Sequence, residues 1–200
     1  MTALPLGLPP VPLAEADTML YPQHLADAED LFRRLHDDLP WRQEHLTLFG
    51  KRIAQPRLSL YQGDVPYTYS GLTLAAAAWH PVLADLRDRC AELAGMPFNT
   101  VLANLYRDGS DSMDWHADDE AELGAEPVIA SVSLGAPRRF QMRRKDKTGE
   151  AHCLTLGGGD VLIMGPKSQV HWMHRVPKTK TTVGPRINLT FRFVREPQRR

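Results

Sequence analysis

The chain has 200 residues, 42% of them hydrophobic, and its 24 Lys and Arg residues balance 24 Asp and Glu residues. That length supports one compact domain with a substantial core, and no apolar run is long enough to cross a membrane. The two cysteines, Cys90 and Cys153, lie far apart and in no zinc-binding spacing, which excludes a disulfide framework and a structural zinc site. We therefore expect a cytoplasmic, intracellular protein that works as a monomer.

Charge is distributed unevenly along this neutral chain. Residues 1–100 carry a net charge of −4 and residues 101–200 a net charge of +4. The positive charge gathers in residues 138–147, with six bases and one acid, and in residues 167–192, with six bases and no acid. Such clusters suit a polyanion, although a solvated basic loop gives the same pattern.

The N-terminal part predicts a leader followed by a helix. Residues 1–17 are rich in proline and have no basic start, so they do not have the pattern of a signal peptide, and we expect a poorly ordered leader. Residues 18–200 are expected to form one domain. Apolar residues recur at every third or fourth position within residues 22–39, which predicts an amphipathic helix that Pro40 ends.

The next stretch predicts hairpins and then a second helical region. Residues 41–71 place β-branched and aromatic residues in short pieces between turn residues, a pattern typical of hairpin strands. Helical periodicity returns over residues 74–95, where Pro81 suits the first turn of a helix and Gly95 suits a C-cap.

After Gly95 the helical period disappears and short β-strand patterns follow one another. Turn residues separate them, which is typical of a sandwich or barrel. The segments are residues 98–107, 127–135, 138–144, 151–156, 160–165, 170–176 and 185–194.

A candidate metal site follows the first of these segments. Residues i and i+2 of an extended chain point to one face, so His116 and Asp118 can meet one cation, although a surface hydrogen bond between them would also explain the pair. His171 and His174 are the candidates for a third ligand. Two His and one carboxylate with open positions describe a non-haem Fe(II) facial triad.

The last predicted strand has one polar and one apolar face. Arg186, Asn188, Thr190 and Arg192 alternate with apolar residues. In most proteins the polar face would meet water, but inside a jelly-roll it would offer two guanidiniums to a carboxylate ligand. We expect an α+β, mainly β fold, with N-terminal helices and a double-stranded β-helix (jelly-roll) core over residues 97–195.

These motifs together resemble the signature of the AlkB family of nucleic-acid dealkylating dioxygenases, closest to its double-strand-DNA repair branch. The resemblance runs from about Leu46 to Phe193 and is carried by NLY at 104–106, HADDE at 116–120, His174 and RINLTFR at 186–192. It implies Fe(II) at His116, Asp118 and His174, because the family places its distal His twelve residues before the position of Arg186. His171 would then serve packing or contact the substrate.

The resemblance also implies a cosubstrate site for 2-oxoglutarate. We expect Arg186 at the distal C5 carboxylate with Tyr106, and Arg192 nearer the C1 end with Asn104. The full implied set is Asn104, Tyr106, Arg186, Asn188, Thr190 and Arg192.

The substrate side is implied in the same way, with residues 41–71 acting as a nucleotide-recognition hairpin lid. Residues 48–50 resemble the family's finger hairpin, whose Phe49 would wedge into a duplex, and Tyr69 would stack a flipped base against His116. Core packing of Leu48 and Phe49, and ion pairs of Asp119 and Glu120 with Arg138 or Arg139, are the structural alternatives. The implied substrate contacts are Leu48, Phe49, Gly50, Tyr67, Tyr69, Asp119 and Glu120.

The implied activity is direct-reversal DNA repair by oxidative demethylation of bases such as 1-methyladenine and 3-methylcytosine. It uses Fe(II), 2-oxoglutarate and O2 and releases succinate, CO2 and formaldehyde. Double- and single-stranded alkylated DNA are both expected partners, and the neutral charge of the chain keeps single strands and RNA open. Two alternatives are a dioxygenase for RNA or protein, and a metal-holding, nucleic-acid-binding jelly-roll without turnover.

Overall fold

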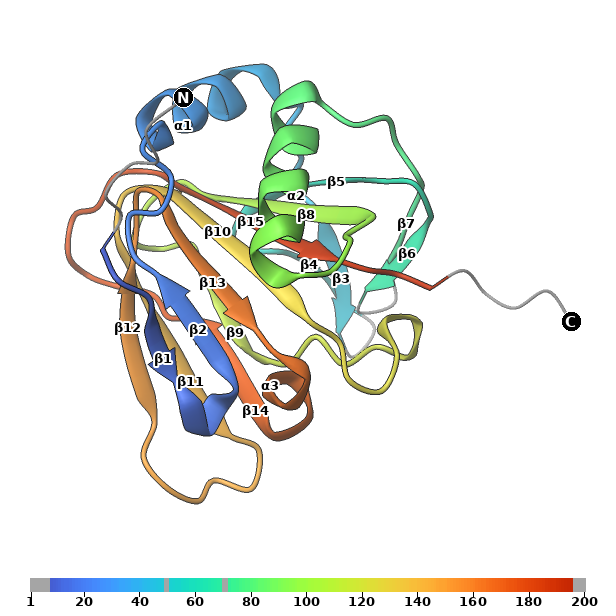
Figure 1. Cartoon of the computed structure of the whole chain (residues 1–200). Coiled ribbons are helices and arrows are strands. Elements are labelled where there is room, and N and C mark those ends of the chain that lie inside the picture. The colour runs from blue at the N-terminus through green and yellow to red at the C-terminus, as the bar shows by residue number, and fades with distance from the viewer. Residues whose placement is uncertain (1–7, 49–50, 70–71, 196–200) are drawn as a thin grey trace, which may run out of the picture.

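In the computed structural model, residues 8–48, 51–69 and 72–195 are described. Within them, a seven-stranded and a four-stranded antiparallel sheet face each other, and α1 and α2 cover the outer face of the larger sheet (Figure 1). The expected mainly β jelly-roll is confirmed. None of the described helices has the length and apolar character that a bilayer crossing requires.

The last strand, β15, is an interior strand of the larger sheet. Its strands are, in spatial order, β1 (Val11–Leu13), β2 (Thr18–Tyr21), β13 (Asp160–Met164), β10 (Ile129–Gly135), β15 (Arg186–Arg192), β8 (Thr100–Tyr106) and β5 (Leu58–Gly63). Because β15 lies between β10 and β8, hydrogen bonds on both sides fix its register. Its side chains therefore alternate between the two faces of the sheet.

The smaller sheet and two hairpins complete the β-structure. The smaller sheet has the order β12 (His152–Leu156), β11 (Arg138–Arg144), β14 (Trp172–Val176) and β9 (Met113–His116). The hairpins are β3 (His45–Leu48) with β4 (Lys51–Ala54), and β6 (Tyr67–Tyr69) with β7 (Leu72–Leu74). All seven strand segments predicted after Gly95 are present, and β9 is an additional strand.

The side chains of β15 alternate between an apolar face, which joins a hydrophobic cluster, and a polar face. Ile187, Leu189 and Phe191 join the cluster beneath α1 (Ala28–Asp38) and α2 (Pro81–Ala94), where helix residues such as Leu35 and Leu83 are fully buried. The intervening polar residues consequently face the space between the two sheets. The second cluster, which includes Phe140 and Trp172, closes that space. The polar face of β15 therefore lies inside the protein and is not exposed to solvent.

The expected poorly ordered leader is wrong for residues 11–17. Val11–Leu13 pairs with β2, and the short 3-10 helix Ala14–Ala16 follows it. Leu13 and Ala16 are buried in the cluster between the sheets. The apolar surface that these residues bury accounts for their order despite the prolines.

Both helices begin later than their sequence patterns predict. α1 starts at Ala28, because the backbone N–H of Leu25 donates to the carbonyl of Gly159 and the chain before the helix is engaged with the loop ahead of β13. α2 starts at Pro81, where the His80 side chain accepts a hydrogen bond from the N–H of Val82. Gly95 ends it as predicted, with a φ of 67° that favours glycine.

The segment around His171 also differs from its prediction. Pro166–His171 forms the short helix α3, and β14 begins only at Trp172. Pro166 occupies the first helical turn, where its missing N–H costs nothing. His171 is thus the exposed last residue of a helix and does not share a strand with His174.

The interior packing of β15 yields a stability prediction. Phe191 is 0% exposed and Phe193 is 39% exposed. Phe191→Ala should lower the free energy of unfolding by about 3–5 kcal/mol, whereas Phe193→Ala should cost less than about 1 kcal/mol, both measured by urea unfolding. Equal losses for the two variants would contradict the assignment of Phe191 to the core.

Candidate active site

The two candidate imidazoles meet across neighbouring strands. His116 on β9 is the register partner of His174 on β14, and their ring centroids are 4.2 Å apart. Asp118 follows two residues after the end of β9, and its Oδ2 lies 3.9 Å from Nε2 of His174. Its backbone N–H donates to Oε1 of the buried Gln169 in α3 at 2.9 Å, which holds the carboxylate in place. The structure therefore brings His116, Asp118 and His174 together.

Arg192 sets the charge state of this cluster. Its Nη2 donates to Oδ1 of Asp118 at 2.6 Å, and both side chains are buried. Burial alone would raise the pKa of Asp118, but the guanidinium and the two imidazoles outweigh it and lower that pKa to about 2. Asp118 is therefore a carboxylate at neutral pH.

Both imidazoles are neutral at the same pH. Burial lowers the pKa of His174 to about 3, and the neighbouring His116 adds to the shift. Burial also lowers the pKa of His116. Nδ1 of His116 lies 2.8 Å from the carbonyl of Asp114, so it carries the proton and leaves Nε2 free as a donor to a cation.

The polar face of β15 forms a row between the sheets, and β8 lies beside it in register. Arg186 is opposite Tyr106, Asn188 is opposite Asn104, and Thr190 is opposite Leu102. Asn188 donates to Oγ of Ser131 at 2.8 Å, and Thr190 lies next to it, with its hydroxyl 3.3 Å from Oδ1 of Asn188. Arg192 ends the row beside the imidazole cluster. The row thus leads away from that cluster along the barrel.

Arg186 closes the far end of this row. It is 1% exposed, its guanidinium lies 5.3 Å from the centre of the Tyr106 ring, and Nη2 donates to Oγ of Ser133 at 2.8 Å. Burial lowers the pKa of Arg186. Its Nε and Nη1 have no hydrogen-bond partner among the described residues. Two buried donors at one end of a polar row suit a carboxylate ligand.

Asn104 differs from its predicted place beside Arg192. The register puts Thr100 opposite Arg192, and the Oδ1 of Asn104 accepts a bond of 2.7 Å from Nε of Arg57. Arg57 was missed at the sequence level, because an arginine after a proline in a hairpin region gives no sign that it is buried. It is 4% exposed and also reaches the carbonyl of Ser112 at 3.5 Å, just before β9.

Arg138 is a second buried cation that the sequence did not reveal. It donates to the backbone carbonyls of Asp108, Asp111 and Pro177, each at 2.8 Å. These bonds tie the β8–β9 loop to the β14–β15 loop below Tyr106. The Arg138 guanidinium therefore does not form the alternative ion pair with Asp119 or Glu120.

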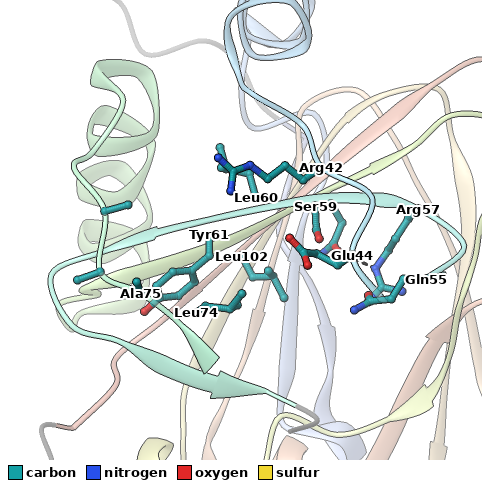
Figure 2. A pocket seen from close by; sticks show the side chains of 13 residues that line it. Arg42, Glu44, Gln55, Arg57, Ser59, Leu60, Tyr61, Leu74, Ala75 and Leu102 are labelled. Atoms are coloured by element: carbon teal, nitrogen blue, oxygen red, sulfur yellow. Dashed lines mark hydrogen bonds between the residues drawn. The ribbon is translucent and has the colours of Figure 1, made fainter. Parts of the chain in front are cut away.

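Two cavities open beside these residues and share Gln55 and Arg57 in their walls. One, of about 260 Å³, lies against β5 and reaches Leu102 and Asn104 of the β8 row; Figure 2 shows Arg57 and Gln55 at one end and Tyr61 and Leu74 at the other. The second, of about 610 Å³, is lined by His116 and by residues from β4, the start of β9 and the end of β14. The larger one gives access to the imidazole cluster.

The predicted substrate residues are only partly placed. Tyr67 is buried, 5.6 Å from the Arg192 guanidinium, and burial raises its pKa. Glu120 is half-buried with a pKa raised by burial and by Asp118. Asp119 is exposed and pairs with Lys145 at 2.7 Å. Phe49 and Gly50 lie outside the described residues, as do the side chains of Leu48 and Tyr69.

The donor atoms would have to draw together around a metal. No group of three His, Cys, Asp or Glu side chains in the described ranges has the spacing of bound ligands. Neighbouring ligands of an octahedral metal at about 2.1 Å lie about 3 Å apart, so the 3.9 Å gap between Asp118 and His174 must shrink by about 1 Å. Oδ2 of Asp118 is buried without a hydrogen-bond partner in this part of the chain, and the donor types suit Fe(II).

Known proteins share both the sequence and the fold. A model of the 2OG-Fe(II) oxygenase superfamily matches residues 17–192. Alpha-ketoglutarate-dependent dioxygenase alkB homolog 3 from Bos taurus is 44% identical over 179 residues, which cover 85% of this chain and 63% of that protein. The Homo sapiens protein of that name is 42% identical over 194 residues, covering 92% and 68%. This chain thus spans about two thirds of the length of these relatives.

Two further matches extend the comparison. DNA oxidative demethylase ALKBH2 from Mus musculus is 42% identical over 181 residues, covering 84% of this chain and 76% of that protein. The solved structure of OsALKBH1 matches with a TM-score of 0.63 at 21% identity, covering 92% of this chain and 100% of that one, which is a likeness of fold. The fold and the family match define a 2-oxoglutarate and Fe(II)-dependent oxygenase. Within that class, the chain belongs to the AlkB family.

The Asp118–Arg192 pair yields a second prediction, tested in metal-free protein. Asp118→Asn and Arg192→Met should each lower the free energy of unfolding by about 3–5 kcal/mol, because each leaves a buried group without its partner. The double variant should lose at least about 2 kcal/mol less than the sum. Additive losses in urea unfolding would mean that the pair does not act as a unit.

The contribution of the same pair to the free energy of unfolding should also depend on pH. The pKa of Asp118 is lowered from 3.8 to about 2 on folding, so its contribution is complete above about pH 4 and is lost as the pH falls through about 2. The stability difference between the wild type and Asp118→Asn should therefore shrink over that range.

Proposed function

We propose that this protein removes N-alkyl groups from DNA bases of the 1-methyladenine and 3-methylcytosine type by oxidative demethylation. The observation that carries the proposal is the buried cluster of two neutral imidazoles and one carboxylate at the end of a buried row with an under-bonded guanidinium. Support also comes from the relatives, whose names include a DNA oxidative demethylase.

His116, Asp118 and His174 would hold Fe(II). Two neutral imidazoles and one carboxylate leave open positions on the metal for a 2-oxo acid and O2. When bound, the iron supplies the activation of O2 that couples decarboxylation of 2-oxoglutarate to hydroxylation of an alkyl carbon. The protein holds the donors in the required protonation states by burial and by the charge of Arg192.

The β15 row would bind 2-oxoglutarate in a fixed direction. Arg186, whose Nε and Nη1 have no hydrogen-bond partner among the described residues, would meet the distal C5 carboxylate beside Tyr106. Arg192 lies at the opposite end, next to Asp118, and so orients the C1 end toward the metal ligands. Asn104, Asn188 and Thr190 line the path between them. This direction keeps the 2-oxo group of the cosubstrate near the imidazoles.

The larger cavity would receive the flipped nucleotide, because it reaches His116 from outside. Tyr67, Asp119 and Glu120 would contact the nucleotide, and Tyr69 with the 48–50 finger would hold the base and fill the gap that it leaves in the duplex. Hydroxylation of the N-methyl carbon gives a hydroxymethyl group, one oxygen atom of O2 going to that carbon and the other to succinate. The N–C bond then breaks, formaldehyde leaves with its carbon, and the base is restored.

The proposal is tested by incubating the protein with Fe(II), 2-oxoglutarate, ascorbate and methylated oligonucleotides. We expect stoichiometric formaldehyde, succinate and unmethylated base from DNA carrying 1-methyladenine or 3-methylcytosine. Single-stranded DNA, duplex DNA and RNA of the same sequence are run side by side. Succinate without loss of any base methyl group would contradict the proposal.

The ligand assignment has its own control within the chain. His116→Ala, Asp118→Ala and His174→Ala should abolish turnover and weaken Fe(II) binding, followed by titration of the metal, at least about tenfold. His171→Ala, which changes an exposed histidine at the end of α3, should bind metal like the wild type. The reverse outcome would make His171 the third ligand.

A further inference from the structure

The fold separates the two basic runs of the sequence into interior and surface cations. Arg138, Arg186 and Arg192 are buried. Arg143 of β11 and Arg175 of β14 instead meet on the outer face of the smaller sheet, at the indole of Trp115 on β9. Their guanidinium carbons lie 4.1 Å and 4.5 Å from the centre of that ring. Two arginines 32 positions apart, one from each basic run, thus join Trp115 in one cationic cluster, Trp115–Arg143–Arg175.

The charge of this cluster is not neutralised by neighbouring carboxylates. Neither arginine takes part in an ion pair among the described residues. Nε of Arg175 donates to the neutral Oε1 of Gln141 at 2.8 Å, and Nε of Arg143 is buried without a hydrogen-bond partner in that part of the chain. The cluster therefore retains two positive charges and unused donors.

Most carboxylates near the cluster form ion pairs with other residues. Asp119 pairs with Lys145, and Asp146 pairs with Arg144. Asp114 is exposed next to Trp115, and its carboxylate accepts the backbone N–H of that residue. A single exposed carboxylate does not balance both arginines.

Two members of the cluster, Trp115 and Arg175, line the larger cavity. Trp115 and His116 are neighbours on β9, so their side chains point to opposite faces of the strand. Trp115, His116, Arg175 and Lys178 all line that cavity of about 610 Å³. A ligand whose base reached His116 would pass the indole of Trp115 and Arg175, and Arg143 lies against the same indole.

We infer that the Trp115–Arg143–Arg175 cluster binds the phosphodiester backbone of the DNA strand that carries the target nucleotide. The inference rests on the proposed function and adds a location for the strand outside the catalytic cavity. Guanidinium forks match phosphate oxygens, and the indole holds both forks in place before binding, which lowers the entropy cost. It also explains how a chain with no net charge can hold a polyanion.

The test measures binding and not turnover. Affinity for an unmodified single-stranded DNA of about 12 nucleotides is followed by fluorescence anisotropy as NaCl is varied. Arg143→Gln and Arg175→Gln should each weaken binding about tenfold and reduce the slope of log K against log salt by about 0.7, the value for one phosphate contact on a single strand. Arg175→Lys keeps the charge and should retain the slope.

Two controls separate the cluster from general charge. Arg33→Gln removes an exposed arginine of α1 and should leave affinity and slope unchanged. Arg139→Gln removes an exposed arginine of β11 that has no contact with the indole in the described structure, and it should also leave affinity and slope unchanged. Melting temperatures of all variants report whether the fold is intact.

The inference is overturned if the wild type does not bind the strand. It is equally overturned if folded Arg143→Gln and Arg175→Gln bind like the wild type, or no worse than Arg33→Gln. Failure of the demethylation assay alongside the predicted loss of salt slope would remove the proposed reaction and leave the phosphate site standing.

Discussion

The ion pair between Asp118 and Arg192 is the interaction on which the interior of this protein depends. The two side chains are 1% and 3% exposed, and either charge alone would be costly to bury. Arg192 comes from β15, an interior strand of the large sheet, and Asp118 from the loop after the edge strand of the small sheet. Their bond therefore connects the two sheets at the point where the imidazoles gather, and it keeps Asp118 ionised.

The far end of the same strand has the opposite character. Arg186 is as deeply buried as Arg192, but its partners are a hydroxyl and an aromatic ring, and no carboxylate compensates it within the described chain. The fold thus satisfies one guanidinium and leaves donors of the other unused. A dicarboxylic ligand with one end at the metal would supply the missing charge. One end of β15 therefore has its guanidinium neutralised within the fold, and the other end keeps free donors for the carboxylate of the proposed cosubstrate.

Much of this arrangement could be predicted from the sequence, because it depends on local periodicity. The seven strand segments follow from alternation and turn residues, and the alternation of Arg186 to Arg192 separates the faces of β15 correctly. The meeting of His116, Asp118 and His174 could be predicted only with the family resemblance. Sequence spacing alone does not decide between His171 and His174. The helix that starts at Pro166 runs into the predicted strand segment 170–176 and ends at His171, which therefore lies outside the strand that carries His174.

The features that were missed depend on contacts between distant residues. Arg57 is buried because Asn104, 47 positions away, accepts its hydrogen bond. Residues 11–13 form a strand because β2 offers them an edge and because Leu13 finds a place between the sheets. Residues 22–27 keep the apolar spacing of a helix, yet Gln23 adopts a φ of 48° and Leu25 bonds to Gly159. Tertiary partners override local preference at each of these places.

The central claim is that the β15 row is a receptor for a diacid whose distal carboxylate meets Arg186. The most direct measurement is calorimetric titration of Fe(II)-loaded protein, without oxygen, with 2-oxoglutarate and with 2-oxobutanoate, which lacks that carboxylate. The wild type should bind 2-oxoglutarate at least about tenfold more tightly, since a hydrogen bond to a charged group contributes about 1.5–3 kcal/mol. Arg186→Met should abolish the difference. Equal binding of the two acids by the wild type, or a difference that survives in Arg186→Met, would contradict the account.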